Sequence, residues 1–335
     1  MKNIELPRKV VVGENAIQQI KEVVDELDLK GSSLVLADEI TKNIAGERIQ
    51  KELGAEIFIL NHNLDEELKK ILEKIYSNNI KFLVGVGGGK VIDTAKLASF
   101  KAKIPFLSVP TAASHDGITS PQVSLKGEKP ISIRAQPPLG VIADLKIIKN
   151  APHKLLAAGC ADVISNYTSV LDWKLAHREW GEYYGDYAAT LAMMSSEIVM
   201  ANAARIKDDP SILMEALISS GVAICIAGSS RPCSGSEHLF SHALDIITPK
   251  PALHGEQCGV GCIMMAYLHK GEWTKVRNSL RIIGAPTNAK ELGIEEKYII
   301  QALVMAHEIR NRYTILKDGL TESEAKSLAK VTRVI

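Results

Sequence analysis

Residues 82–96 read FLVGVGGGKVIDTAK, and this stretch decides the fold. The apolar run at 82–86 is typical of a buried strand, three glycines follow at 87–89, and the residues from Val91 onward have helical spacing. Where a strand turns through glycines into a helix, backbone amides and the positive end of the helix meet at one point, and a phosphate binds well there. The stretch therefore predicts a βα unit that carries a phosphate site.

The glycine turn fits neither of two familiar nucleotide motifs. Lys90 stands where G-x-G-x-x-G has its last glycine, and Val91 stands where G-x-x-x-x-G-K-[ST] has the hydroxyl that contacts Mg²⁺. The turn therefore predicts phosphate binding without selecting a nucleotide. A tight turn that binds no ligand is the alternative interpretation.

The same alternation continues on both sides of this stretch. Apolar runs with strand character occupy residues 9–12, 33–37, 57–60, 106–109 and 141–143. Segments with helical spacing lie at residues 15–27, 41–53 and 63–77. Repeated βα units imply a doubly wound, mainly parallel sheet. Residues 123–133 interrupt the pattern and predict a hairpin with Gly127 and Glu128 at its turn.

The character of the sequence changes after about residue 150. The later segments are long, rich in alanine and methionine, and helical in period, and they include residues 154–172, 187–206, 211–226 and 299–310. A chain of 335 residues is also too long for one typical hydrophobic core. We therefore predict an α/β domain over residues 1–150 and an all-helical domain over residues 151–335.

The composition excludes several classes of protein. Lys and Arg total 40 and Asp and Glu total 39, so the formal net charge of +1 gives no general attraction to nucleic acid or an anionic membrane. The N-terminus lacks the apolar core of a signal peptide, and no apolar run approaches the roughly 20 residues of a membrane span. The five cysteines include no C-x-x-C pair. The number and spacing of the cysteines argue against disulfides and against a cysteine zinc site. We expect them to be small buried side chains in a protein of the reducing cytoplasm.

One residue and one segment of the first half follow predicted strands directly. Because the carboxyl ends of parallel strands border the ligand crevice, we expect both to face it. Asp38 ends an early strand and is placed to accept hydrogen bonds from a ribose; a helix cap or a solvated loop acid is equally consistent. Residues 109–121, VPTAASHDGITSP, follow another strand and include His115 and Asp116. The alternative for this segment is an ordinary turn rich in Ser and Thr.

Three segments of the second half carry candidate metal ligands. Residues 234–245, SGSEHLFSHALD, have Ser234 and Glu237 in capping-box spacing, so we expect a helix start with His238 and His242 on one face. Residues 254–261, HGEQCGVG, begin with His254, and residues 157–166, AAGCADVISN, contain Asp162 in an otherwise apolar helical run.

These residue types suit a divalent metal. Of the nine histidines, three fall between residues 238 and 254, and imidazole and carboxylate are good zinc ligands. Two histidines and one aspartate would leave coordination positions open, as a catalytic site requires. Taken singly, Asp162 also fits a buried network partner, and a histidine pair four residues apart also fits an ordinary surface or core pair.

Together these segments identify a resemblance that spans nearly the whole chain. The chain resembles the archaeal-type sn-glycerol-1-phosphate dehydrogenases, a family within the iron- and zinc-dependent alcohol dehydrogenase and dehydroquinate synthase superfamily. The segments that carry the resemblance are LPRKVVVGENAI, VGGGKVIDTAK, PTAASHDGITSP, GCADVISN, SRPCSGSEHLFSH and HGEQCGVG. The last three are specific to the family, whereas the glycine turn alone is not.

The resemblance implies an activity and a set of site residues. The family reduces dihydroxyacetone phosphate to sn-glycerol 1-phosphate, the backbone of archaeal ether lipids, with NADH or NADPH, and its members are homo-oligomers. Asp162, His238 and His254 would then hold Zn²⁺. Asp116, Asp162 and His242 would contact the substrate. The dinucleotide would be bound by Gly87, Gly88, Gly89, Lys90, Val91, Ile92, Asp93, Thr111, Ala112, Ala113, Ser114 and Ser120, with Asp38 as a further candidate.

Two roles within this framework are hypotheses. His242, one turn from His238, would assist proton delivery to the substrate. Asp162 and His242 are the expected catalytic residues. Arg231 and Ser234, which precede a helix start, would bind the substrate phosphate. Three other readings compete: a glycerol dehydrogenase that acts on unphosphorylated polyols, a dehydroquinate synthase-type lyase, and a non-catalytic nucleotide-binding regulator with a structural metal.

Overall fold

The structure, a computed structural model, describes residues 3–61, 63–125 and 131–335. The chain divides into two compact units. The first comprises residues 1–124 and 132–152, and the second comprises residues 125–131 and 153–335. The turn expected at Gly127 and Glu128 lies outside the described residues.

A parallel sheet forms the centre of the first unit. Its strands follow the order β1-β8-β5-β4-β2-β3, and each neighbouring pair is parallel. Their bounds are β1 Lys9–Gly13, β2 Ser33–Asp38, β3 Glu56–Leu60, β4 Phe82–Gly87, β5 Phe106–Pro110 and β8 Gly140–Asp144. A separate two-stranded sheet pairs β6 (Gln122–Leu125) with β7 (Ile131–Arg134), which is the expected hairpin.

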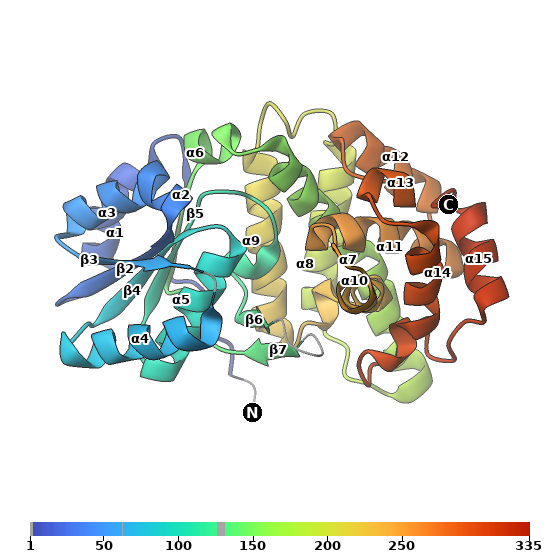
Figure 1. The fold of residues 1–335 in the computed structure, drawn as a ribbon, viewed down its shortest axis with the longest axis horizontal. Coiled ribbons are helices and arrows are strands. Elements are labelled where there is room, and N and C mark those ends of the chain that lie inside the picture. Colours follow the sequence, from blue (N-terminus) through green and yellow to red (C-terminus); the bar gives the residue numbers. More distant parts are fainter. Residues whose placement is uncertain (1–2, 62, 126–130) are drawn as a thin grey trace. The chain divides into compact units, whose positions relative to one another are not determined.

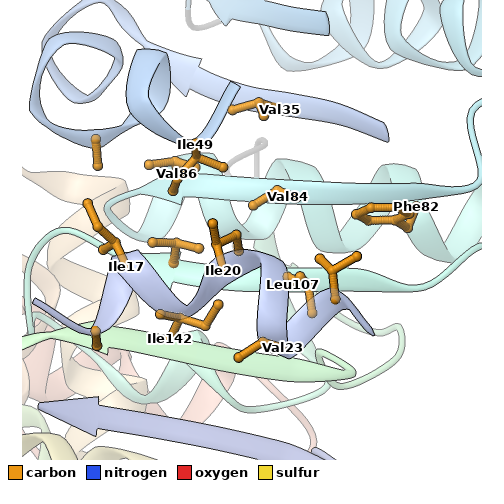
Figure 2. Packing of buried hydrophobic residues seen from close by; sticks show 14 of the residues in the cluster. Ile17, Ile20, Val23, Val35, Ile49, Phe82, Val84, Val86, Leu107 and Ile142 are labelled. Atoms are coloured by element: carbon orange, nitrogen blue, oxygen red, sulfur yellow. The ribbon is translucent and has the colours of Figure 1, made fainter. Parts of the chain in front are cut away.

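Helices cover both faces of this sheet, as Figure 1 shows for α1 and α3 on one side and α4 and α5 on the other. Their bounds are α1 Ile20–Glu26, α2 Glu39–Thr41, α3 Glu47–Leu53, α4 Leu64–Ser77, α5 Gly89–Ala102 and α6 Leu145–Asn150. A π-helical turn at Lys42–Gly46 joins α2 to α3, inside the single helix expected at residues 41–53. The core under α1 and α3 interlocks branched side chains, among them Ile20, Val84 and Ile142 (Figure 2).

The second unit is helical. Its helices are α7 His153–Trp180, α8 Asp186–Ala201, α9 Ser211–Ala227, α10 Ser236–Ile247, α11 His254–Leu268, α12 Trp273–Ile283, α13 Ala289–Leu292, α14 Glu296–Met305 and α15 Glu322–Val331. The 28-residue α7 packs against α8 and α11, and α10 packs against α11. Among the described residues, no helix is long and apolar enough to cross a membrane. The α/β unit and the helical unit confirm the predicted fold class.

The sheet order places the glycine turn at a reversal. β3 lies to one side of β2 and β4 to the other, so the winding direction changes between β2 and β4. In open parallel sheets, ligands bind outside the carboxyl ends of the strands at such a switch point. Asp38 ends β2 and Gly87 ends β4, so both border this point.

Candidate active site

The three glycines after β4 serve different purposes. A Cβ on Gly87 would lie 2.7 Å from the side chain of Val91, and a Cβ on Gly89 would overlap the ring of His115. Both glycines are therefore required by packing within the protein. A Cβ on Gly88 would meet nothing within 4 Å, so this residue borders open space. Gly88 is also the N-cap of α5 and provides no side-chain cap, which leaves the first amides of the helix to a ligand.

The structure brings the other predicted dinucleotide segments to the same turn. The amide of Thr111 donates to Gly87 O at 3.1 Å, which joins the segment after β5 to the end of β4. The fully buried Lys96 Nζ donates to Asp93 Oδ1 and to the carbonyls of Gly117 and Gln122. This cation fixes the loop that contains Ser120 against α5.

Unpaired hydroxyls in this loop fit a polar ligand. Ser120 Oγ and Thr119 Oγ1 are buried and have no hydrogen-bond partner within the described part of the chain. A buried hydroxyl without a partner is costly, and a ligand that donates or accepts a hydrogen bond removes that cost. The residues present therefore fit a bound dinucleotide.

Asp38 caps a helix in this structure. Its Oδ1 accepts from the amides of Ile40 and Thr41, at 3.0 and 2.7 Å, and Thr41 Oγ1 accepts from the amide of Asp38. The cap was one of the two alternatives to ribose binding. Asp116 begins a short 3₁₀ turn, Asp116–Ile118, and its contact with a substrate stays a prediction.

Three helices of the second unit bring the predicted metal ligands together. Asp162 lies in the middle of α7, His238 in the first turn of α10, and His254 at the start of α11. His238 Nε2 is 3.9 Å and His254 Nε2 is 3.8 Å from Asp162 Oδ1. Two donor atoms about 2.1 Å from one tetrahedral ion lie about 3.4 Å apart, so small side-chain movements suffice to bind a metal. Asp162 and His238 are nearly buried, whereas the side chain of His254 is 39% exposed and gives access to the cluster.

A second layer of side chains orients both histidines. Glu237 Oε1 accepts from His238 Nδ1 at 2.8 Å, which leaves Nε2, the nitrogen toward Asp162, to a metal. Ser241 Oγ lies 3.2 Å from His254 Nδ1 and leaves Nε2 of that ring to the cluster as well. Both histidines thus present the same nitrogen to the metal position.

Glu237 is a fully buried carboxylate whose hydrogen-bond partners come from α7 and from the start of its own helix. Besides His238, it accepts from Thr168 Oγ1, Ser169 Oγ and the amide of Gly235. Burial alone would raise the pKa of Glu237, but His238 and these hydrogen bonds hold it down at about 2. An ionised carboxylate therefore stands directly behind one metal ligand.

The start of α10 differs from the predicted capping box. Ser234 lies before the N-cap, which is Gly235, and no side chain of the segment caps the helix. Asp172 of α7 does so instead, since its Oδ2 accepts from the amide and hydroxyl of Ser236 at 2.6 and 2.5 Å. The capping-box prediction was wrong because the cap comes from a residue 64 positions away.

His242 lies beside the cluster without belonging to it. Its ring stacks on that of His254, with centroids 5.8 Å apart, and Arg310 Nη2 donates to its Nε2 at 3.2 Å. Burial lowers the pKa of His242, the nearby carboxylate of Asp245 opposes this, and the charge of Arg310 lowers it further. The ring is therefore neutral near pH 7, with its proton on Nδ1.

Arg231 and Ser234, the predicted phosphate ligands, lie in a packed turn. Arg231 donates from Nε and Nη2 to the carboxylate of Glu182 and from Nη1 to Tyr313 O. Ser234 O accepts from Arg312, which also donates to Ser230 Oγ. The guanidinium of Arg231 and the carbonyl of Ser234 hold the turn together, so another guanidinium is favoured for a phosphate. A contact between the Ser234 hydroxyl and a phosphate stays a prediction.

Sequence reasoning missed the place that Glu237, Arg310 and Cys258 have in the site. Cys258 is buried, as expected of all five cysteines, but it belongs to a group with Asp162, His238 and His254 whose ligand atoms lie within 4.8 Å of one another. Burial raises the pKa of the Cys258 thiol, and the carboxylates of Asp162 and Glu237 raise it further. The signal was present, because Cys258 follows His254 by four residues, the same spacing that marked His238 and His242.

The chain is similar in sequence to known proteins. A family model described as iron-containing alcohol dehydrogenase matches residues 11–152. A protein of Methanosarcina mazei named glycerol-1-phosphate dehydrogenase (NAD(P)+) is 53% identical, over 99% of this chain and 96% of the relative. A protein of the same name from Thermococcus sibiricus is 54% identical, over 99% and 98%.

Solved structures share the fold. Glycerol dehydrogenase from Schizosaccharomyces pombe superposes with a TM-score of 0.83 at 20% identity, covering 99% of this chain and 90% of that chain. A probable glycerol dehydrogenase from Sinorhizobium meliloti gives 0.81 at 20% identity, with all of both chains covered. At such identities the likeness establishes the architecture alone.

Proposed function

The chain belongs to the family of glycerol-1-phosphate dehydrogenases, and on that premise we propose that it reduces dihydroxyacetone phosphate to sn-glycerol 1-phosphate with NADH or NADPH. The product serves lipid biosynthesis. The observation that carries the proposal is the cluster of Asp162, His238 and His254, which three separate helices build in a chain of this family. An open glycine turn at the switch point of the sheet supports the dinucleotide.

Asp162, His238 and His254 are the proposed metal ligands, and zinc is the proposed metal. When bound, the metal acts as a Lewis acid toward the ketone oxygen, and the nicotinamide supplies the hydride. The protein's part is to fix the donors in place. Glu237 and Ser241 hold the two imidazoles with Nε2 toward Asp162, so little rearrangement accompanies binding.

His242 is proposed to assist proton delivery to the reduced substrate, through substrate hydroxyls or water. Its Nε2 accepts from Arg310, so the neutral ring carries its proton on Nδ1. Within the described residues this Nδ1 has no hydrogen-bond partner, and Asp245 Oδ2 at 3.8 Å is beyond hydrogen-bond distance. An N–H beside the predicted ligand histidines can donate a hydrogen bond to the reduced substrate or to a water, and the proton itself comes from that water, because a neutral imidazole does not release its own proton. A His242→Ala variant with full turnover and an unchanged pH profile would remove this role.

Arg310 is the proposed contact for the substrate phosphate, in place of Arg231. It is the guanidinium that reaches the histidines, whereas Arg231 is held by Glu182 and Tyr313 O. A guanidinium can bind phosphate oxygens in pairs and hold a dianion against the metal position. Its contact with His242 would also couple substrate binding to the residue that is proposed to assist proton delivery.

The cofactor is proposed to bind at the open turn. The amides at the start of α5 would take the pyrophosphate, and the segments around Thr111 and Ser120 would border the dinucleotide. We further expect the protein to form a homo-oligomer. We also expect it to lie in the cytoplasm, because five free cysteines are typical of a reducing compartment.

The test is an assay of NADH and NADPH oxidation with dihydroxyacetone phosphate and with dihydroxyacetone. The proposal predicts turnover with the phosphate ester and little with the unphosphorylated ketone. The reverse preference would indicate a glycerol dehydrogenase. Phosphate release without net loss of NADH would indicate a lyase. No turnover with any ketone or polyol would leave a nucleotide-binding regulator.

A further inference from the structure

Cys258 stands one helical turn after His254 on α11, on the side that faces Asp162. The thiol belongs to the four-residue group whose ligand atoms lie within 4.8 Å of one another, and the residue is fully buried. Its Sγ lies 3.6 Å from His254 Nε2, the nitrogen that faces Asp162. The sulfur is therefore a neighbour of the same donor atoms that the proposed metal needs.

The spacing matches a shared ion. Zinc lies about 2.3 Å from a thiolate sulfur and about 2.1 Å from an imidazole nitrogen, which places the two donors about 3.6 Å apart in a tetrahedron. Cys258 Sγ and His254 Nε2 have this separation without any movement. The carboxylate oxygen of Asp162 lies 3.8 and 3.9 Å from the two histidines, slightly wider than ideal. Of these three separations, that between sulfur and nitrogen is the closest to coordination geometry.

Two glycines explain how the sulfur comes so close. A Cβ on Gly255 would overlap Ala158 O of α7, and a Cβ on Gly259 would lie 2.9 Å from Ala161 Cβ. Both sites need glycine because α11 approaches α7 closely at that point. Ala158 and Ala161 lie in the turn of α7 that leads directly into Asp162, so this approach brings Cys258 close to the carboxylate.

We propose that Cys258 Sγ is a fourth protein donor to the metal and that it makes the centre selective for zinc. The inference rests on the proposed metal centre. Thiolate ligands favour zinc over harder ions such as Mn²⁺ and Mg²⁺, which prefer carboxylate, carbonyl and water. A bound cation drives the proton off a coordinating thiol, and that proton passes to solvent. Zinc also accepts a fifth ligand, so four protein donors still admit a substrate oxygen.

Cys262 provides the matched comparison. It lies one turn further along α11, is equally buried, and its Sγ donates to Ile164 O at 3.7 Å. Cys262 is not a member of the metal group. It therefore represents a cysteine that serves packing alone, in the same helix and against the same partner.

The experiment replaces the native metal with Co²⁺ and compares the full-length protein with Cys258→Ser and Cys262→Ser. A thiolate bound to Co²⁺ gives a charge-transfer absorption in the near ultraviolet. We expect this band in the unmodified protein and in Cys262→Ser, and its loss in Cys258→Ser. If the unmodified protein binds Co²⁺ without the band, the proposal is overturned, whether or not the variants fold.

Affinity measurements separate ligation from packing. Direct titration of the metal-free proteins should show that the affinity of Cys258→Ser for zinc is at least about 10- to 100-fold weaker. Loss of an outer-shell partner of a metal ligand costs that much. The affinity for Mn²⁺ should change little. Equal weakening for both metals would show a structural role and contradict the proposal. The same preparations are assayed with dihydroxyacetone phosphate. A thiolate band without turnover refutes the proposed function alone, and turnover without the band refutes this inference alone.

Discussion

The glycine turn of the first unit and the metal cluster of the second are built by opposite means. At the turn, the proposed binding groups are backbone amides, and Gly88 stays open because no side chain is there. At the cluster, the proposed binding groups are side chains, and buried partners such as Glu237 and Ser241 hold them. A backbone site needs a position without a side chain, so one added methyl group damages it. A side-chain site needs residues that hydrogen-bond to the ligands and orient them, so substitutions of those residues damage it as well.

The largest effect is expected at a metal ligand. His254→Ala removes an imidazole that faces Asp162, and we expect kcat to fall by about 10³-fold or more, because Lewis-acid stabilisation is worth several kcal/mol. Turnover and bound zinc should be measured on the same sample. His307→Ala is the control, since His307 is not a member of the metal group and its Nδ1 pairs with Val304 O. Retained zinc together with full turnover would remove His254 from the centre.

A smaller loss is expected at Arg310. Arg310→Ala should lower kcat/KM for dihydroxyacetone phosphate about 10- to 100-fold, because a hydrogen bond to a charged group contributes about 1.5–3 kcal/mol. The value for dihydroxyacetone should change much less. Arg231→Ala should instead lower the melting temperature, because it leaves Glu182 without its partner. If Arg231→Ala changes the substrate ratio and Arg310→Ala does not, the original assignment of the phosphate site stands.

The second layer of the cluster is tested by Glu237→Gln. The amide keeps the size of the side chain but removes the charge that accepts from His238, so we expect zinc affinity to fall about 10- to 100-fold. Glu256→Gln is the matched control, because Glu256 is also buried and caps the start of α11 through the amide of Leu253. Equal losses in both variants would mean that the effect is one of folding.

The smallest effect separates two adjacent glycines. Gly88→Ala meets open space, so the free energy of unfolding should stay unchanged while the Kd for NADH rises about tenfold, or about 1.4 kcal/mol. Gly89→Ala drives a methyl group into His115 and should lower the free energy of unfolding by about 1–3 kcal/mol. Calorimetry and denaturant unfolding measure the two quantities. Unaltered NADH binding in a folded Gly88→Ala protein would contradict the proposed pyrophosphate site.

The sequence predicted the first unit well because its signals are local. The run at residues 33–37 became β2, Ser33–Asp38, and the run at 82–86 became β4, Phe82–Gly87, since buried parallel strands are short, apolar and bounded by turns. The reason for Gly89 was not visible, because it depends on a histidine 26 positions later.

The second unit hid more of its site because its partners are distant in sequence. A helix was expected over residues 299–310, but α14 ends at Met305, and the chain beyond it is held by contacts to other helices. Asp172 of α7 accepts from the amide of Ile315, and Arg310 reaches His242 of α10. The spacing of apolar residues along the sequence does not reveal contacts between distant segments, so it could not predict the role of Arg310.

The central claim is that the cluster of Asp162, His238 and His254 serves reduction of dihydroxyacetone phosphate. The most direct test removes the metal with a chelator, returns zinc, and follows NAD(P)H oxidation with the chirality of the product. We predict that chelation abolishes turnover, that zinc restores it, and that the product is sn-glycerol 1-phosphate. Full turnover in metal-free protein, or formation of sn-glycerol 3-phosphate, would contradict the claim.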